Sequence, residues 1–252
     1  MKKLVAVFIL LVSVFACTDN FEEMNIDPKR ASENVPPETL FSNAQKNLAD
    51  VVTSSNVNLN IFRLLAQYWT QTTYTDESRY DLSTRNIPQN FWNVLYRDVL
   101  RDLKEARDLI SEDVDLTDAQ RANRLAMIEI TEIYAWTVLV NTYGDIPYFE
   151  ALDIDNVTPG YDDDRAIYDD LLTRIDQAIN SLNMEASGFE GADLIYGGDI
   201  EKWMKFANTL KLKLGMTLAD VDPATAARVA SEAAPNVFES NADNATLQYL
   251  ET

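Results

Sequence analysis

Histidine is absent from this 252-residue sequence, and cysteine occurs only once. Without histidine, the chain cannot form a Ser-His-Asp or Cys-His catalytic arrangement, or a His-ligated zinc or iron site. A single cysteine also excludes a disulfide within the chain and a cysteine-rich metal cluster. The chemistry that stays open is that of carboxylates, as catalytic acids and bases or as oxygen ligands of calcium. We expect no cofactor.

Basic residues are scarce as well, because 21 Lys and Arg stand against 41 Asp and Glu, for a formal net charge of −20. Such a chain repels the phosphates of nucleic acid, so we exclude DNA and RNA as partners. The hydrophobic fraction of 46% and the aromatic fraction of 10% indicate a folded core and not a disordered chain. The length allows one large domain or two small ones.

The N-terminus has the pattern of a signal peptide. Lys2 and Lys3 precede an apolar run from Leu4 to Phe15, which is too short to span a bilayer as a helix. The run ends in Val-Phe-Ala-Cys, which is typical of a bacterial lipoprotein processing site. This pattern predicts that Cys17 is the first mature residue and carries lipid chains that anchor the protein to a membrane. The alternative is an ordinary secretory signal followed by an unrelated cysteine.

The segment after Cys17 is polar, has little periodicity and contains three prolines, Pro28, Pro36 and Pro37. These features are typical of a tether. We therefore predict a lipoprotein signal peptide at residues 1–16, a lipid-anchored tether at 17–37 and a helical domain at 38–252.

Beyond residue 38, apolar residues recur at helical spacing, and strand-like alternation is scarce. The predicted helices are Thr39–Val52, Asn58–Thr72, Phe91–Ile110, Ala119–Tyr143, Arg165–Leu182, Asp199–Leu218 and Pro223–Ala234. Short turns between them favour antiparallel pairs, so we predict an all-α, repeat-like fold whose spacing exceeds the roughly 34-residue period of a tetratricopeptide repeat. We expect the tryptophans on apolar helix faces, Trp92, Trp136 and Trp203, to lie in the core.

Residues 67–92 (QYWTQTTYTDESRYDLSTRNIPQNFW) gather aromatic, arginine and asparagine side chains in a polar linker. Aromatic rings bind the C–H faces of sugars, and Arg or Asn can bind hydroxyls, although an oligopeptide could use the same groups. The candidate ligand-binding residues are Trp69, Tyr74, Arg79, Tyr80 and Asn86, with Tyr68 and Arg85 nearby. For Tyr68 and Trp69 the alternative is a place in the core, on the inner face of the predicted helix Asn58–Thr72.

Two groups of carboxylates allow a functional or a structural interpretation. Asp162, Asp163 and Asp164 could ligate calcium, but they lack the spaced pattern of a calcium loop and suit the start of a helix. Glu129 and Glu132 could act as the acid and base of a glycosidase, but they lie in an otherwise apolar helix. In both cases we favour the structural interpretation, and we predict no metal site and no enzymatic activity.

Three segments carry more specific motifs: LVNTYGDIPYFEAL (139–152), TPGYDDDRAIYDDLLTRIDQAINSL (158–182) and DLIYGGDIEKWMKFANTLKLKLGMTLADVDP (193–223). In the first, Gly144 suits a helix C-cap and Pro147 prevents the helix from continuing. Taken in this order, the motifs Tyr143–Tyr148, Tyr161-Asp162 and Tyr196–Leu212 resemble the SusD/RagB family of nutrient-binding outer-membrane lipoproteins.

The resemblance implies a tetratricopeptide-like helical scaffold whose loops bind a glycan or peptide at the cell surface, without catalysis. It also implies a partner, a SusC-like, TonB-dependent β-barrel of the outer membrane. Because members of this family are much longer, we expect the sequence to be the N-terminal portion of the protein, with further ligand contacts beyond Thr252. The alternative function is that of an envelope scaffold that binds protein partners and no nutrient.

Overall fold

A computed structural model of the protein describes residues 35–249. The predicted signal peptide, the lipidation site Cys17 and the tether up to residue 34 lie outside the described residues and stay predictions. The fold presented below is that of the unit Pro36–Thr252.

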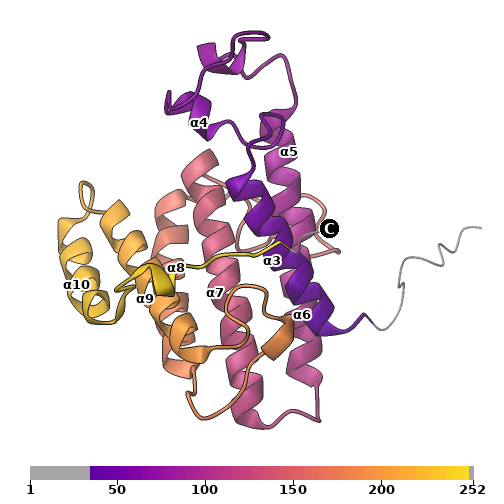
Figure 1. The fold of residues 1–252 in the computed structure, drawn as a ribbon, viewed down its shortest axis with the longest axis vertical. Helices are drawn as coiled ribbons and strands as arrows, with labels where there is room; N and C mark the ends of the chain where they lie inside the picture. Colours follow the sequence, from indigo (N-terminus) through magenta and orange to yellow (C-terminus); the bar gives the residue numbers. More distant parts are fainter. Residues whose placement is uncertain (1–34, 250–252) are drawn as a thin grey trace, which may run out of the picture. The chain divides into compact units, whose positions relative to one another are not determined.

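This unit is helical, as predicted (Figure 1). Its elements are α3 (Pro37–Thr53), α4 (Phe62–Leu65), η1 (Glu77–Arg79), α5 (Ile87–Asn93), η2 (Val94–Leu100), α6 (Arg101–Glu112), α7 (Asp118–Tyr143), α8 (Asp164–Ser181), η3 (Glu190–Ala192), α9 (Ile200–Thr217), α10 (Pro223–Ala233), η4 (Ala234–Asn236) and η5 (Asn241–Asp243). Extended pairing between residues 35 and 249 is limited to one isolated antiparallel bridge, between Ile146 and Asp162. None of the helices described in this range has the length and apolar character that crossing a bilayer requires.

All predicted helices but one are confirmed, with shifts of a few residues at their ends. The predicted helix Phe91–Ile110 is longer, because α5, η2 and α6 follow one another without a break and η2 is a π-helical segment. Helix α7 begins at Thr117 with a capping box to Gln120, which satisfies two backbone N–H groups that the helix cannot bond. It ends at Gly144, whose φ of +75° suits glycine.

The predicted helix Asn58–Thr72 is wrong, because only α4 forms in this range. The side chain of Asn60 donates hydrogen bonds to the carbonyls of Val51 and Val52 and accepts one from the N–H of Phe62. Such side-chain bonds offer the backbone an alternative to a helix. After α4, Gln67 takes a left-handed conformation with φ of +59°, which ends the helix.

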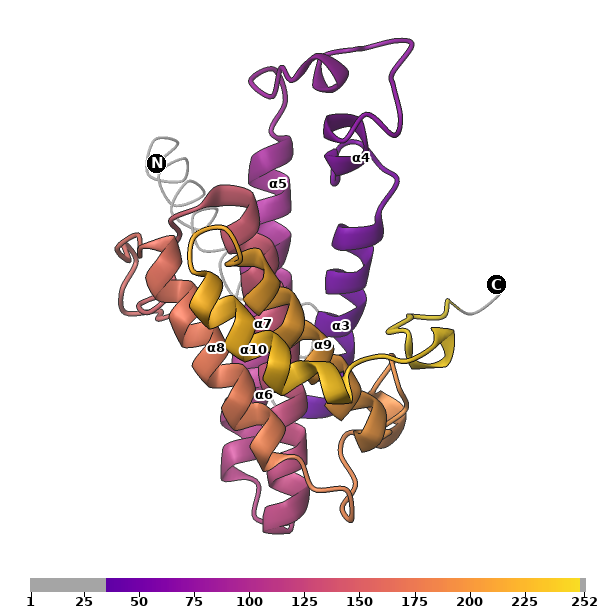
Figure 2. The same cartoon turned by 90° about the vertical axis from the view of Figure 1, so that its left-hand side faces the viewer.

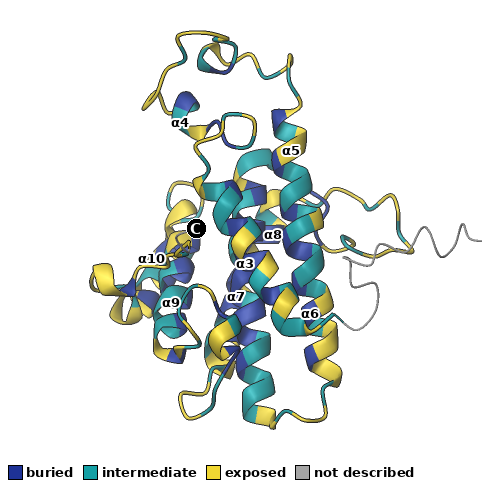
Figure 3. Cartoon of the chain, turned by 45° about the vertical axis from the view of Figure 1, so that its right-hand side comes forward, coloured by how far each residue is buried: buried dark blue, intermediate teal, exposed yellow. Residues whose placement is uncertain are grey.

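The helices pack in sequence, each against its neighbours along the chain. The column α5–η2–α6 lies between α3 and α7, α8 covers α7, α9 packs on α8, and α10 packs on α9. In Figure 1 this order runs from α10 at the left to α3 and α6 at the right, and Figure 3 shows that much of α7 is buried. Trp136 and Trp203 are in the core as predicted, whereas Trp92 is only half-buried against it.

A buried carboxylate joins the Asp-Leu-Ile-Tyr-Gly-Gly turn to α3 and α9. One oxygen of Asp193 accepts a hydrogen bond from Gln45 of α3 (2.9 Å), and the other accepts one from the indole of Trp203 in α9 (2.7 Å). The same carboxylate also accepts hydrogen bonds from the backbone N–H groups of Ile195, Tyr196 and Gly198. This part of the third motif therefore has a structural role.

Candidate ligand-binding loop

The segment that joins α4 to α5 projects from the helices, at the top of Figure 1, and exposes aromatic rings. Tyr68 is 83% exposed, Trp69 49%, Tyr74 81% and Tyr80 55%. The core interpretation of Tyr68 and Trp69 is therefore wrong, because the helix on which it rested does not form. Large aromatic side chains gathered on a surface are a feature of binding sites.

Arg63 holds Trp69 in place. Its guanidinium lies 5.2 Å from the centroid of the Trp69 ring, in a cation–π contact. The same guanidinium donates to the carbonyls of Thr53 (2.8 Å) and Ser54 (2.5 Å), at the C-terminal end of α3. Trp69 is thereby ordered through a charged group that the scaffold itself fixes.

Tyr80 is held against the end of α4. Its hydroxyl donates to the carbonyl of Leu65 (3.1 Å) and accepts from the amide of Gln67 (3.0 Å). Gln67, Tyr74 and Tyr80 also have positive φ values of 59°, 55° and 63°. A left-handed conformation costs a non-glycine residue roughly 1–2 kcal/mol, and such strain clusters at functional sites. Strain and exposed rings thus occur in the same loop.

The buried residue Glu77 ties the two halves of the loop together. Its carboxylate accepts from Gln71 (2.8 Å) and from Arg85 (2.5 Å), and Arg85 also donates to Asn58. Burial acts to raise the pKa of Glu77, but the hydrogen bonds from Gln71 and Arg85 outweigh it, so the pKa lies below its usual range. The other oxygen, Oε1, is buried and accepts no hydrogen bond from the described residues.

Sequence reasoning missed Glu77, because it lies in a polar run with no periodicity and nothing there marks it as buried. Arg85, which the sequence placed near the candidate contacts, directs its guanidinium inward to Glu77 and Asn58. We therefore infer that Glu77 and Arg85 maintain the conformation of the loop.

The remaining candidates, Arg79 and Asn86, are both exposed. The Arg79 side chain is 73% exposed and lies 3.8 Å from Asp76 in an ion pair, and such exposed pairs contribute little stability. Asn86 precedes α5, but its side chain makes no capping bond there. Tyr74 is joined to none of the other candidates by a hydrogen bond or ring contact among the described residues.

Two cavities lie near the surface of this unit. One, of about 280 Å³, lies at the base of the loop and is mainly apolar, with walls that include Phe62 of α4, Phe91 of α5 and Tyr143 of α7. The other, of about 340 Å³, lies between α3, α7 and α9 beneath residues 245–249. None of the predicted ligand contacts lines either of these two cavities.

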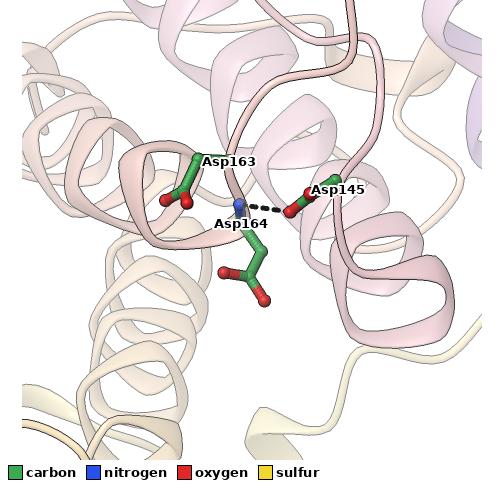
Figure 4. Close-up of side chains that lie close together, drawn as sticks. All are labelled: Asp145, Asp163 and Asp164. Carbon is green, nitrogen blue, oxygen red and sulfur yellow. Dashed lines mark hydrogen bonds between the residues drawn. The ribbon is translucent and has the colours of Figure 1, made fainter.

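Asp145, Asp163 and Asp164 lie close together at the start of α8, with carboxylate oxygens within 4.8 Å of one another (Figure 4). Asp163 accepts a hydrogen bond from the N–H of Ala166 (3.1 Å), and Asp145 accepts one from the N–H of Asp164 (3.1 Å). Both residues thus satisfy backbone donors of the first turn of α8. This agrees with the interpretation of the acidic run as a helix start.

Glu129 and Glu132 of α7 form an ion-paired cluster with arginines of the neighbouring helices. Arg107 of α6 lies 2.5 Å from a carboxylate oxygen of each, and Arg174 of α8 pairs with both. Burial raises the pKa of Glu132 to about 7, although Arg107 and Arg174 act to lower it. The cluster links three helices, so its geometry favours a structural role for the two glutamates.

This helical chain is similar in sequence and in fold to known proteins. The sequence pattern of a SusD-like family, described as starch-binding and associating with the outer membrane, matches residues 28–252. Among solved structures, a chitin-binding protein is 30% identical with a TM-score of 0.71, over 83% of this chain and 45% of that one. A SusD homolog from Bacteroides uniformis is 27% identical with a TM-score of 0.61, over 84% and 46% of the two chains.

A chitin-binding SusD homolog from Flavobacterium johnsoniae shares the fold, with a TM-score of 0.66 at 21% identity, over 81% of this chain and 44% of that one. The chain thus spans less than half the length of each of these three structures. No curated protein matches the sequence.

Proposed function

Because this chain belongs to the SusD-like family, whose pattern covers residues 28–252, we propose that it is a non-enzymatic binding protein that captures an oligomeric glycan at the outer membrane. The observation that carries the proposal is the loop between α4 and α5, which displays exposed rings on a strained, internally braced backbone. The match to a chitin-binding protein supports a glycan over a peptide.

The chemistry of binding follows from the side chains of this loop. The faces of Trp69, Tyr74 and Tyr80 would lie against the C–H faces of sugar rings. Arg79 and Asn86 would donate hydrogen bonds to hydroxyls and ring substituents. Glu77 would act through Arg85 and Gln71, because it holds the loop in shape without reaching the surface.

We also propose that the protein delivers its ligand to a SusC-like, TonB-dependent β-barrel and is held at the membrane by lipid chains on Cys17. Family membership supports the first part, and the processing motif at residues 14–17 supports the second. Mass spectrometry of the protein from membranes tests the anchor, because an unmodified Cys17 would contradict it. Co-purification with a barrel protein tests the partner.

The binding proposal is tested by calorimetry and affinity electrophoresis of the full chain against chitin-derived, starch-derived and peptide ligands. We expect saturable binding to a glycan, weakened about tenfold by Trp69→Ala or Tyr74→Ala, which corresponds to about 1.4 kcal/mol. Met216→Ala is the control, because Met216 is an exposed apolar residue on α9, outside the loop. Equal binding by wild type and the loop variants would refute the site. Binding of no glycan at all would favour an envelope scaffold.

A further inference from the structure

A second group of exposed aromatic side chains lies on a different loop, residues 144–163 between α7 and α8. Tyr161 is 69% exposed and Phe149 is 58% exposed. Figures 1 and 2 agree that this loop, beside the start of α8, is separate from the loop between α4 and α5. The contacts described above for the first loop do not explain these two residues.

Tyr161 is the outer end of a stack of rings that begins in the core. Trp136 lies edge-to-face with Tyr96 at 5.4 Å, and Tyr96 stacks on Trp92 at 4.6 Å. Tyr161 lies 6.4 Å from Trp92, with the two ring planes 27° apart. A surface ring with such support is ordered before any ligand arrives, so binding loses little conformational entropy.

Hydrogen bonds fix the backbone beneath this stack. The hydroxyl of Tyr96 donates to the carbonyl of Pro147 (2.6 Å), and the N–H of Asp162 donates to the carbonyl of Ile146 (2.9 Å). The carboxylate of Asp162 accepts from the N–H groups of Tyr148 and Phe149, both at 2.9 Å. Phe149 and Tyr161 therefore lie on backbone segments that are bonded to each other.

Acceptor groups flank the bridge between Ile146 and Asp162, next to Tyr161 in the sequence. Side chains alternate between the two faces of extended backbone, so Tyr161 and Asp163 lie on the opposite face from Asp162, and Asp145 on the opposite face from the buried Ile146. Asp145 accepts one backbone hydrogen bond, from Asp164 (Figure 4), and Asp163 accepts one from Ala166. Each thus keeps a second carboxylate oxygen able to accept from a hydroxyl.

The charge of the loop restricts the ligand. Residues 144–164 include seven acidic residues and no lysine or arginine. An anionic polymer would be repelled, whereas a neutral, hydroxyl-rich chain can place a sugar ring on Tyr161 and donate hydrogen bonds to the carboxylates.

We propose that Tyr161 and Phe149, with Asp145 and Asp163, form a second contact surface for a neutral glycan, so that a long polymer engages both loops at once. The inference rests on the proposed function for the class of ligand and adds a second place of contact. Because two linked contacts act through effective concentration, loss of the second surface should weaken binding of a long polymer far more than binding of a short oligomer.

The test compares the full-length wild type with Tyr161→Ala and Phe149→Ala on glycol chitin and amylopectin in affinity gels, and on chito- and malto-oligosaccharides by calorimetry. We expect each variant to weaken polymer binding about tenfold and oligosaccharide binding less than about twofold. Tyr161→Phe, which keeps the ring, should bind the polymer like the wild type, and thermal unfolding should confirm that every variant is folded.

The outcomes distinguish the second surface from the first loop. Wild-type polymer binding by folded Tyr161→Ala and Phe149→Ala would overturn this inference while leaving the first loop intact. Loss of polymer binding in Tyr161→Ala, with no effect of Tyr74→Ala, would support the second surface and contradict the first loop. Binding restricted to the cationic polymer chitosan and abolished by salt would overturn the assignment to a neutral glycan.

Discussion

Single polar side chains decide much of the local structure of this protein. Asp193 is buried and joins three segments, and Glu77 is buried within a loop whose other residues are exposed or half-buried. Each is tolerated because hydrogen-bond donors converge on it, and a buried carboxylate without such donors would be strongly destabilising. Removal of such a carboxylate therefore leaves the buried groups that donate to it without a hydrogen-bond partner.

Asp193→Asn should lower the free energy of unfolding by about 2–4 kcal/mol. One carboxylate oxygen faces Gln45 and two backbone N–H groups, and the other faces Trp203 and Gly198. Either orientation of the asparagine amide therefore points its NH₂ group at donors. Urea unfolding measures the loss, and Asp220→Asn, at an exposed aspartate near the end of α9, should be close to neutral. Equal stability of the two variants would contradict the role of Asp193.

Tyr74 allows strain and binding to be separated. Tyr74→Gly and Tyr74→Ala both remove the ring, but only glycine adopts the φ of +55° without strain. We expect the glycine variant to be about 1 kcal/mol more stable than the alanine variant. Both variants should bind glycan equally weakly. Urea unfolding measures the difference in stability, and calorimetry on the same samples measures the binding. Tighter binding by the alanine variant would mean that the backbone conformation contributes to recognition without the ring.

At the scale of elements, the helices are held by closely fitted pairs and by the ion-paired cluster between α6, α7 and α8. The pair α9 and α10 depends on a small residue at their crossing. A Cβ atom at Gly215 would lie 2.5 Å from Cγ1 and 2.7 Å from Cβ of Val229. These separations are shorter than any ordinary contact, so α10 would have to move.

Gly215→Ala should therefore destabilise the protein by about 1–3 kcal/mol through overpacking. The cost of overpacking outweighs the gain of roughly 1 kcal/mol that alanine brings as a better helix former than glycine. The loss should be smaller in a Val229→Ala background, where Cγ1 is absent, and a double-mutant cycle by urea unfolding measures the difference. Gly160→Ala is a matched control, because nothing lies within 4 Å of the added Cβ. An equal effect of Gly215→Ala in both backgrounds would exclude a clash with Cγ1 of Val229, because alanine at 229 keeps only the Cβ atom.

At the scale of the whole molecule, the dominant property is the net charge of −20. This field repels anionic ligands and attracts cationic ones, but it acts weakly on a neutral sugar. The proposed contacts are aromatic rings, the side chains of Arg79 and Asn86, and carboxylates that accept from hydroxyls, and none of these requires a charged ligand.

We therefore expect the affinity for a neutral oligosaccharide to change less than about twofold between about 50 mM and about 500 mM NaCl, because no pair of full charges forms or breaks on binding. Calorimetry at the two salt concentrations measures this, with a cationic oligomer of similar length as the control that should lose affinity in salt. A strong salt dependence for the neutral ligand would mean that a charged group of the loop dominates the binding.

The helices could be predicted well, and the site only in part. The helical spacing of apolar residues in Phe91–Ile110 and the C-cap glycine Gly144 are local signals, and each marks an element that forms. Trp69 and Tyr80 were identified from composition alone, and the structure places both on the surface of one loop, although their contact with ligand stays a prediction. Glu77 could not be found, because its burial results from Gln71 and Arg85 folding over it.

Local patterns are enough to predict the helical class, the ends of most helices, the family motifs and the segment in which ligand contacts are expected, since periodicity, capping and turn residues act over a few neighbouring positions. Three features emerge only in the folded chain: it leaves the helical path after α4, Glu129 and Glu132 pair with arginines of other helices, and Tyr161 completes a stack of rings begun at Trp136. These outcomes depend on which distant side chains satisfy a polar group or cover a ring, and that is settled only when the helices pack.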